Sequence, residues 1–444
     1  MTAQRSLPLS ATPAVLRAHG IPISFALLIG AWLFDFQSEG AGQGLALQGI
    51  FLSTYLFALI AFLLGDRARG RAMTGIGIFL PAGLLFLVVG ILSGILHGQE
   101  FYPILRNAIS VIVYVSATFA TARAMVSIDL RALRKFLGIA CLGYALSSLV
   151  IYNAMSGGID LSVVRFQIVG TSSIAALAYI SLSLLFRLSF VELVTLAANG
   201  LILLVSITRT YLFAFVAQAL VPIMNFRRLF GGRMLLVGLA AIIVFIGLLT
   251  FGQGQLDRWQ DRVVSNDSNY SEYQTYYTRL SEWDYMYSSW TGSPREFLIG
   301  SGFAAETTYF YTSDAGGASE HMVGFGHNQY LSEVFTAGTV GGLPLLLVQL
   351  VQGFFALQLV HRLIRRPDLR SDAVFLSAWG ALIVLGTLSA NMFLNTYSQR
   401  GLALWYGIGT GLLMAARSRR SLPPQAMASS GAPLARSRSG VNGN

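Results

Sequence analysis

Residues 324–360, GFGHNQYLSEVFTAGTVGGLPLLLVQLVQGFFALQLV, combine a polar cluster with a run able to cross a membrane. The 33 residues from Asn328 to Val360 exceed what one spanning helix needs at a rise of about 1.5 Å per residue. Helix-breaking residues interrupt this run, at Gly338, Gly341, Gly342 and Pro344. We therefore predict a short helix over 329–337 at the outer surface, followed by a span over 339–360.

The whole chain shares this apolar character. Hydrophobic residues make up 54% of it and charged residues 11%, whereas soluble domains average about 25% charged residues. Apolar runs near or above the roughly 20 residues of a transmembrane helix recur between residues 21 and 416. The composition therefore predicts an all-α polytopic membrane protein with a single transmembrane domain over 21–416.

About twelve transmembrane helices are predicted, within a range of ten to thirteen. Their approximate bounds are 21–36, 45–65, 73–96, 103–123, 136–156, 167–186, 189–207, 210–226, 234–252, 339–360, 373–393 and 399–416. A leader of residues 1–20 precedes them. The tail, residues 417–444, is rich in Ser, Gly, Pro and Arg and is predicted to be disordered.

Most of the 30 Lys and Arg residues lie in short clusters between alternate apolar runs. Because Lys and Arg near span ends favour the cytoplasmic side, this pattern places both termini in the cytoplasm of a bacterial inner membrane. The segment 253–327, between the ninth and tenth spans, is then one long, partly helical periplasmic loop. Membrane orientation accounts for the net charge of +10, so nucleic-acid binding is not predicted.

The predicted periplasmic loop is acidic, with four arginines against ten Asp and Glu residues. An arginine in such a loop needs a local partner, either a carboxylate or an anionic ligand. Three of the four have acidic neighbours in sequence, and these pairs are Asp257 with Arg258, Asp261 with Arg262, and Glu296 with Arg295.

Residues 272–290 have aromatic and apolar side chains at alternating steps of three and four, which is typical of a helix. The stripe comprises Tyr273, Tyr276, Leu280, Trp283, Tyr287 and Trp290. It is predicted to pack on the tops of the spans or lie in the membrane interface, with a sugar-stacking platform as the alternative. Arg279 lies on a flank of this helix, where a lipid-borne phosphate would be met.

Two further residues are candidates for function. Arg209 is expected at the outer end of a span, where it either extends to the headgroups or binds a polyanion. His327 precedes the short helix, for which Asn328 is a plausible N-cap. An imidazole there is either an interfacial hydrogen-bonding group or, with an ordinary pKa near 6.5, a general base.

Four elements occur in a fixed order along the chain, namely SITRT (206–210), TRLSEWDYMYSSW (278–290), SPREFLIGSGF (293–303) and GHNQYLSEVFTAGTVGGL (326–343). Together with the twelve-span plan, they resemble the O-antigen ligase and Wzy-type polysaccharide polymerase family. The motif-bearing part covers roughly residues 200–360. Thr208 stands where serine is usual in that family and keeps a hydroxyl group.

The resemblance implies a set of site residues. Arg209 and Arg279 would hold the pyrophosphate of an undecaprenyl-linked glycan, and His327 would act at the acceptor hydroxyl or beside the phosphate. Candidate supporting or acceptor-binding residues are Asn328, Trp283 and Glu333. The implied partners are the undecaprenyl-pyrophosphate-linked oligosaccharide, a glycan or lipid acceptor, the bilayer and other polysaccharide-assembly membrane proteins.

The expected activity is that of an inverting glycosyltransferase that needs no metal or other cofactor. Pyrophosphate is already a good leaving group, so cations that stabilise developing charge matter more than a general acid. Polymerisation of exopolysaccharide or O-antigen repeat units is favoured, and ligation of finished glycan to lipid A core is the alternative. Cell-wall glycan polymerases are a more distant alternative, and a polysaccharide or lipid transporter is the alternative from another class.

Overall fold

The structure is a computed structural model that describes residues 20–34, 45–65, 79–156, 170–186, 190–206, 210–224, 272–312, 318–323, 326–365 and 371–420. Arg209, the predicted span 234–252 and the segment 253–271 lie outside the described residues.

Helices dominate the described residues. The first eight are α2 (Ile23–Gly30), α3 (Leu45–Gly65), α4 (Phe79–Leu96), α5 (Phe101–Ser127), α6 (Leu130–Ser156), α8 (Ser173–Phe186), α9 (Phe190–Ser206) and α10 (Thr210–Met224). The later elements are α13 (Glu272–Thr291), α14 (Pro294–Ile299), β1 (Thr307–Thr312), β2 (Ala318–Val323), α15 (Gln329–Arg365), α16 (Asp372–Ala390), the 3₁₀ helix η2 (Thr396–Ser398) and α17 (Arg400–Arg420).

Within the described part of the chain, six helices are long and apolar enough to cross a membrane, in α3, α4, α5, α6, α15 and α16. Large apolar side chains on them face outward, such as Phe57 and Leu64 on α3, which are 70% and 72% exposed. Such surface suits contact with lipid. The membrane-protein class is therefore supported, while the count of twelve spans stays a prediction.

Most predicted bounds fall close to observed ends. The boundary predicted near residue 188 separates α8 from α9, and α3 covers 45–65 as predicted. Two predictions need correction. The expected span over 21–36 contains only the eight-residue helix α2, and residues 31–34 form turns. The last span, predicted to end at residue 416, belongs to a helix that continues to Arg420.

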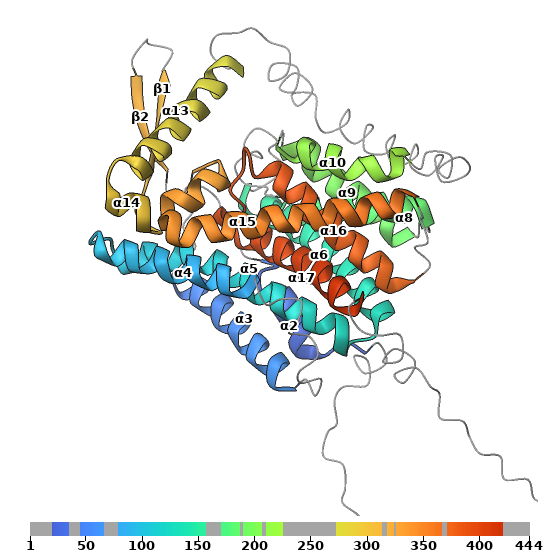
Figure 1. Cartoon of the computed structure of the whole chain (residues 1–444). Coiled ribbons are helices and arrows are strands. Elements are labelled where there is room, and N and C mark those ends of the chain that lie inside the picture. The colour runs from blue at the N-terminus through green and yellow to red at the C-terminus, as the bar shows by residue number, and fades with distance from the viewer. Residues whose placement is uncertain are drawn as a thin grey trace, which may run out of the picture.

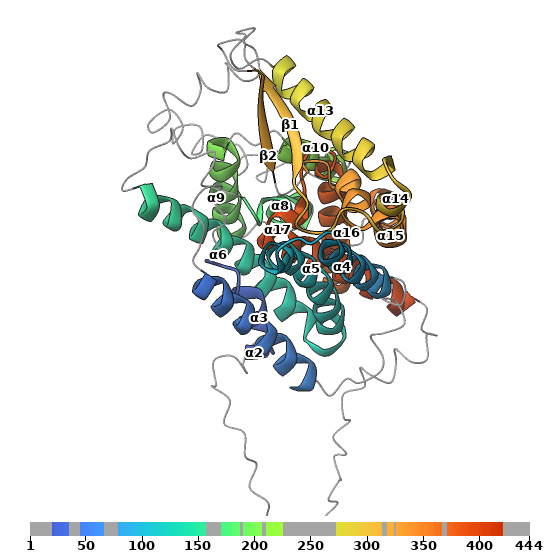
Figure 2. The same ribbon diagram turned by 90° about the vertical axis from the view of Figure 1, so that its left-hand side faces the viewer.

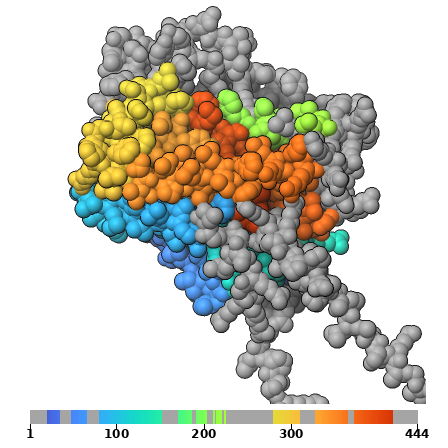
Figure 3. All heavy atoms as spheres, in the orientation of Figure 1, coloured from blue at the N-terminus to red at the C-terminus, as the bar shows by residue number. Residues whose placement is uncertain are grey.

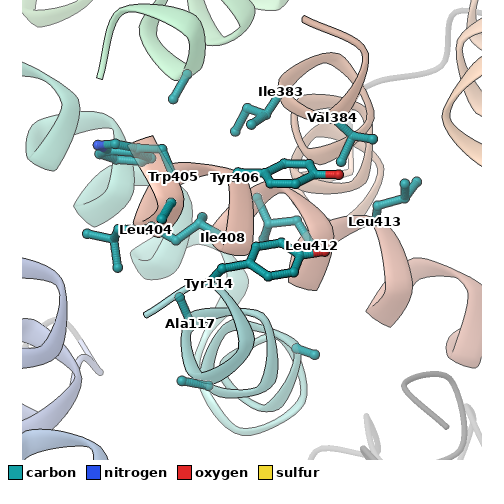
Figure 4. Packing of buried hydrophobic residues seen from close by; sticks show 14 of the residues in the cluster. Tyr114, Ala117, Ile383, Val384, Leu404, Trp405, Tyr406, Ile408, Leu412 and Leu413 are labelled. Carbon is teal, nitrogen blue, oxygen red and sulfur yellow. The ribbon is translucent and has the colours of Figure 1, made fainter. Parts of the chain in front are cut away.

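The core of the bundle forms where α17 packs against α5 and α16. A Cβ atom on Gly407 would lie 2.5 Å from the carbonyl oxygen of Tyr114, and one on Gly411 would lie 2.5 Å from that of Thr118. Small residues allow the helices to approach this closely, as is typical in membranes. Beside this contact, the rings of Tyr114 and Tyr406 stack with centroids 4.8 Å apart (Figure 4).

One amide satisfies both of these tyrosine hydroxyl groups. The hydroxyl of Tyr406 donates to Oε1 of Gln352 at 2.8 Å, and Nε2 of Gln352 donates to the hydroxyl of Tyr114 at 2.9 Å. Buried polar groups need such partners because no water replaces them. The polar groups of this core therefore join α15 to α5 and α17.

Helix α15 consists of two helical segments, as predicted. Ala337 has φ −126° and Gly338 has φ 58° and ψ −163°, which are not helical values. The loop after α14 caps the first segment, since the backbone N–H groups of Ser301 and Gly302 donate to the carbonyl oxygens of Phe335 and Thr336 at 2.7 and 2.9 Å.

The elements of the predicted outer loop gather at one end of the bundle. Helix α13 lies beside the antiparallel hairpin, in which Thr307 pairs with Val323, and both views show the two together (Figures 1 and 2). The hairpin was not predicted from the sequence. From this end α15 runs along the face of the molecule over α4 (Figure 3).

Replacing Gly338 with alanine tests the break in α15. A Cβ there would overlap the backbone of Leu298, and the φ and ψ values suit only glycine. We expect G338A to lower the free energy of unfolding by about 1–3 kcal/mol, measured by thermal unfolding in detergent. Gly49→Ala is the control, because nothing lies within 4 Å of a Cβ at Gly49. Equal melting temperatures for the two variants would contradict the account of the break.

Candidate active site

A buried carboxylate and a histidine form the centre of the candidate site. Glu282 on α13 has a fully buried side chain, and Nδ1 of His327 lies 3.1 Å from each of its carboxylate oxygens. The backbone N–H of His327 also donates to Oε1 of Glu282, at 3.0 Å. One carboxylate therefore fixes both the main chain and the ring of His327.

Two more groups contact the same carboxylate. The hydroxyl of Thr307, at the start of β1, donates to Oε1 at 3.3 Å, and Nη1 of Arg279 lies 3.3 Å from Oε2. Burial raises the pKa of Glu282, but the hydrogen bonds from His327 and the charges of His327 and Arg279 outweigh it. The net effect lowers the pKa of Glu282 below its ordinary value, so the buried group is a carboxylate at neutral pH.

The side chain of His327 is 29% exposed, and within the described residues no hydrogen bond is made by its second ring nitrogen, Nε2. A carboxylate at Nδ1 favours the tautomer with the proton on Nδ1, which leaves a lone pair on Nε2. The geometry can therefore accept a proton at Nε2 and stabilise the resulting imidazolium, as a histidine oriented by a carboxylate does in hydrolases.

Helix α13 turns a different face inward from the one expected. Among residues 278–291 of this helix, Glu282 and Met286, one turn apart, are the fully buried positions, whereas Tyr287 of the predicted aromatic stripe is 55% exposed. The prediction of a helix is confirmed, but its inner face is set by the carboxylate, whose partners lie inside. Of the stripe, Trp283 lies 6.1 Å from Phe393 between ring centroids.

His327 is held close to α13 by its neighbours. A Cβ at Gly326 would overlap Sδ of Met286 and Oγ of Ser332, so a larger residue would force these side chains to shift. After His327, the side chain of Asn328 accepts from the backbone N–H of Leu331 at 3.1 Å, which confirms the predicted N-cap.

Glu333, a candidate supporting residue, lies one turn after Gln329, the first residue of α15. It is 1% exposed, and its Oε1 accepts from Nε2 of Gln329 at 2.9 Å and from Nε2 of Gln349. Its other oxygen, Oε2, has no hydrogen-bond partner among the described residues. Among the described residues, neither Glu333 nor Trp283 makes a hydrogen bond to the carboxylate of Glu282 or the ring of His327.

A small cavity connects these parts of the site. Its lining includes Thr307, Gly326, Gln329, Glu333, Phe335 and Tyr397. Thr307 and Gly326 border the Glu282–His327 pair, whereas Glu333 and Tyr397 belong to α15 and η2. The cavity is therefore lined by neighbours of the central pair and not by Glu282 or His327 themselves.

The structure brings Arg279, His327 and Asn328 together, and Arg209 lies outside the described residues. Sequence reasoning missed Glu282. The spacing of Arg279 and Glu282 at i and i+3 on one helix is a signal for their ion pair. No sequence signal selects Glu282, among the ten acidic residues of the loop, as the partner of His327. The described residues contain no cluster of three His, Cys, Asp or Glu side chains placed to hold a metal ion.

Replacing Glu282 with glutamine tests the buried carboxylate. Because the pKa of Glu282 is lowered on folding, its carboxylate adds stability above the unfolded value of about 4.3. That stability is lost as the pH falls through the lower folded value. We expect E282Q to reduce the free energy of unfolding by about 1.5–3 kcal/mol at pH 7.

The difference between E282Q and wild type should narrow as the pH is lowered below about 4. Thermal unfolding in detergent across this pH range measures it. Asp284→Asn, which changes an exposed carboxylate on the same helix, serves as the control. A constant difference between wild type and E282Q at all pH values would show that the carboxylate charge is not what stabilises the pair.

Comparison with known proteins adds no family assignment. No protein-family model matches the chain, and no similar protein is found among curated proteins.

Proposed function

We propose that the protein is an inverting membrane glycosyltransferase that moves an undecaprenyl-pyrophosphate-linked glycan onto an acceptor hydroxyl at the periplasmic face of a bacterial inner membrane. The observation that carries this proposal is the Glu282–His327 pair, in which a buried carboxylate holds Nδ1 of a partly exposed imidazole. The apolar helices support membrane association, and the order of sequence elements supports the substrate class.

The proposed reaction is a single displacement. The acceptor oxygen attacks the anomeric carbon while Nε2 of His327 takes its proton. The bond from that carbon to the pyrophosphate oxygen breaks, and its electron pair leaves with undecaprenyl pyrophosphate. One displacement inverts the anomeric configuration. Glu282 acts through His327, since its negative charge stabilises the imidazolium that forms.

Arg279 fits the role of a cation for the leaving group. Its side chain is 27% exposed, and one guanidinium nitrogen is held by Glu282. A guanidinium has five N–H donors and can contact a carboxylate and a phosphate at the same time. Arg209 would provide the second cation. With two fixed positive charges, developing charge on the pyrophosphate is stabilised without a metal ion.

Polymerase and ligase activities both fit this site. We favour the polymerase, in which the acceptor is another lipid-linked repeat unit. A null mutant separates the two, because single lipid-linked repeats accumulate without a polymerase and long lipid-linked chains accumulate without a ligase.

Replacing His327 with alanine tests the proposed base. H327A should insert and fold but lose transfer by about 100- to 10,000-fold. The assay incubates purified protein with a polyprenyl-pyrophosphate-linked oligosaccharide and follows longer lipid-linked species. His97→Ala is the matched control, because Nδ1 of His97 bonds only within its own helix end, at 2.8 Å from the carbonyl oxygen of Ser93. Near-normal product from H327A would remove the base assignment.

Treatment with EDTA tests metal independence. Because two arginines are proposed to stabilise the leaving group, we expect turnover to be unchanged in excess chelator. Loss of turnover that magnesium restores would contradict this part of the proposal.

A further inference from the structure

Helix α14 lies against the ends of α4 and α15, two helices that are long and apolar enough to cross a membrane (Figure 1). Nη2 of Arg295 donates to the carbonyl oxygen of Leu96, the last residue of α4, at 2.8 Å. The hydroxyl of Thr339, where the long segment of α15 begins, donates to the carbonyl oxygen of Phe297 at 2.8 Å. Helix α14 is therefore fixed beside the point where both helices end.

The outward face of α14 is apolar and continues onto the C-terminal end of α13. Phe297 is 43% and Leu298 51% exposed. The ring of Phe297 stacks on that of Trp290 with centroids 5.4 Å apart, and the exposed Tyr287 meets Trp290 at 6.1 Å and an interplanar angle of 74°. These four side chains, Tyr287, Trp290, Phe297 and Leu298, are called the aromatic surface below.

The aromatic surface is continuous with the outward faces of the two membrane-type helices. Leu96 at the end of α4 and Val340 near the start of the long segment of α15 are exposed. The backbone of Leu298 lies so close to Gly338 that a Cβ there would overlap it. Atoms of α13, α14, α15 and α4 lie side by side on one face of the molecule (Figure 3). A bilayer that covers α4 and α15 up to their ends therefore also reaches α14.

The free carbonyl groups at these helix ends are satisfied by side chains of the protein. The carbonyl oxygen of Phe297, near the end of α14, accepts from Thr339 and from Nε1 of Trp290 at 3.2 Å. That of Leu96 accepts from Arg295. Backbone groups in lipid need such internal partners because no water is available there. Trp and Tyr are also enriched where a membrane meets water, so both observations favour lipid as the partner of this surface.

We propose that α14 and the C-terminal end of α13 are anchored in the lipid leaflet at this end of the bundle, with Phe297 and Leu298 among the acyl chains and the rings of Tyr287 and Trp290 at the headgroups. This inference does not depend on the proposed activity. Glu282 precedes Trp290 by eight residues on α13, which is about 12 Å along a helix axis. The anchor therefore sets the distance of the Glu282–His327 pair from the membrane.

Fluorescence quenching at single cysteines tests the anchor. Cys141→Ala removes the one native cysteine, and Leu298→Cys then carries an environment-sensitive NBD fluorophore on α14. Leu350→Cys, on the long segment of α15, is the reference for lipid, and Asp284→Cys, on α13, is the reference for water. All three side chains are exposed, so labelling should leave the melting temperature unchanged. The proteins are placed in nanodiscs of phosphatidylethanolamine and phosphatidylglycerol, which leave both membrane faces accessible.

A nitroxide on the lipid acyl chain should quench the probes at residues 298 and 350, and iodide in the water should quench the probe at residue 284. Emission from residue 298 should be shifted to shorter wavelength than emission from residue 284. Strong quenching at residue 298 by iodide but not by the lipid nitroxide overturns the proposal. So does weak quenching there by both agents, which would indicate that a second copy of the chain covers the surface.

A double variant tests whether the anchor holds α13 at the membrane. Phe297→Ser together with Leu298→Ser should reduce lipid quenching, and increase iodide quenching, of a probe at Tyr287→Cys. Phe57→Ser together with Leu64→Ser is the matched control, because it removes an exposed apolar pair from α3 instead. This control should leave both kinds of quenching at residue 287 unchanged. Equal lipid quenching with and without Phe297 and Leu298 would overturn the proposal, whether or not the protein transfers glycan.

Discussion

The arrangement of the candidate active site depends on the burial of one carboxylate. Glu282 is removed from water and therefore needs donors within the protein. It obtains them from three places, which are its own helix through Arg279, the start of β1 through Thr307, and the segment before α15 through His327. A single charge thus determines which face of α13 turns inward and where the hairpin and the imidazole lie. Removing it would take away one contact from each of these three segments.

The break in α15 connects this site to the membrane helices. Because the chain leaves the helical conformation at Ala337 and Gly338, the segment that follows His327 and the long apolar segment are separate helices with their own directions. The loop after α14 caps the first of them, and α4 and α5 hold that loop through Ser93 and Asn107. The loop that caps the segment following His327 is therefore fixed to the bundle by hydrogen bonds to its backbone.

The fold was largely predictable wherever a local pattern determines structure. The lengths of the apolar runs predicted the bounds of α3 and the separation of α8 from α9. The glycines around residue 338 predicted the break in α15. Asn328 was recognised as an N-cap because capping depends on neighbours a few residues away. Each of these features depends on residues close together in the sequence.

Features that depend on distant partners were not predictable. The aromatic spacing correctly predicted that α13 is a helix, but it did not predict which face of the helix is buried. The buried face carries Glu282, because the partners of this carboxylate lie on that side. The pairing of Glu282 with His327 joins residues 45 positions apart, and no periodicity encodes it.

The most direct test of the central claim compares turnover of three variants, Glu282→Gln, His327→Ala and the double variant, in the transfer assay with a lipid-linked oligosaccharide. If the carboxylate acts only through the imidazole, removing it after the imidazole is gone should cost nothing further. The account predicts that the double variant is about as slow as His327→Ala alone. A double variant slowed by the product of the two single effects would contradict it, because Glu282 and His327 would then act independently.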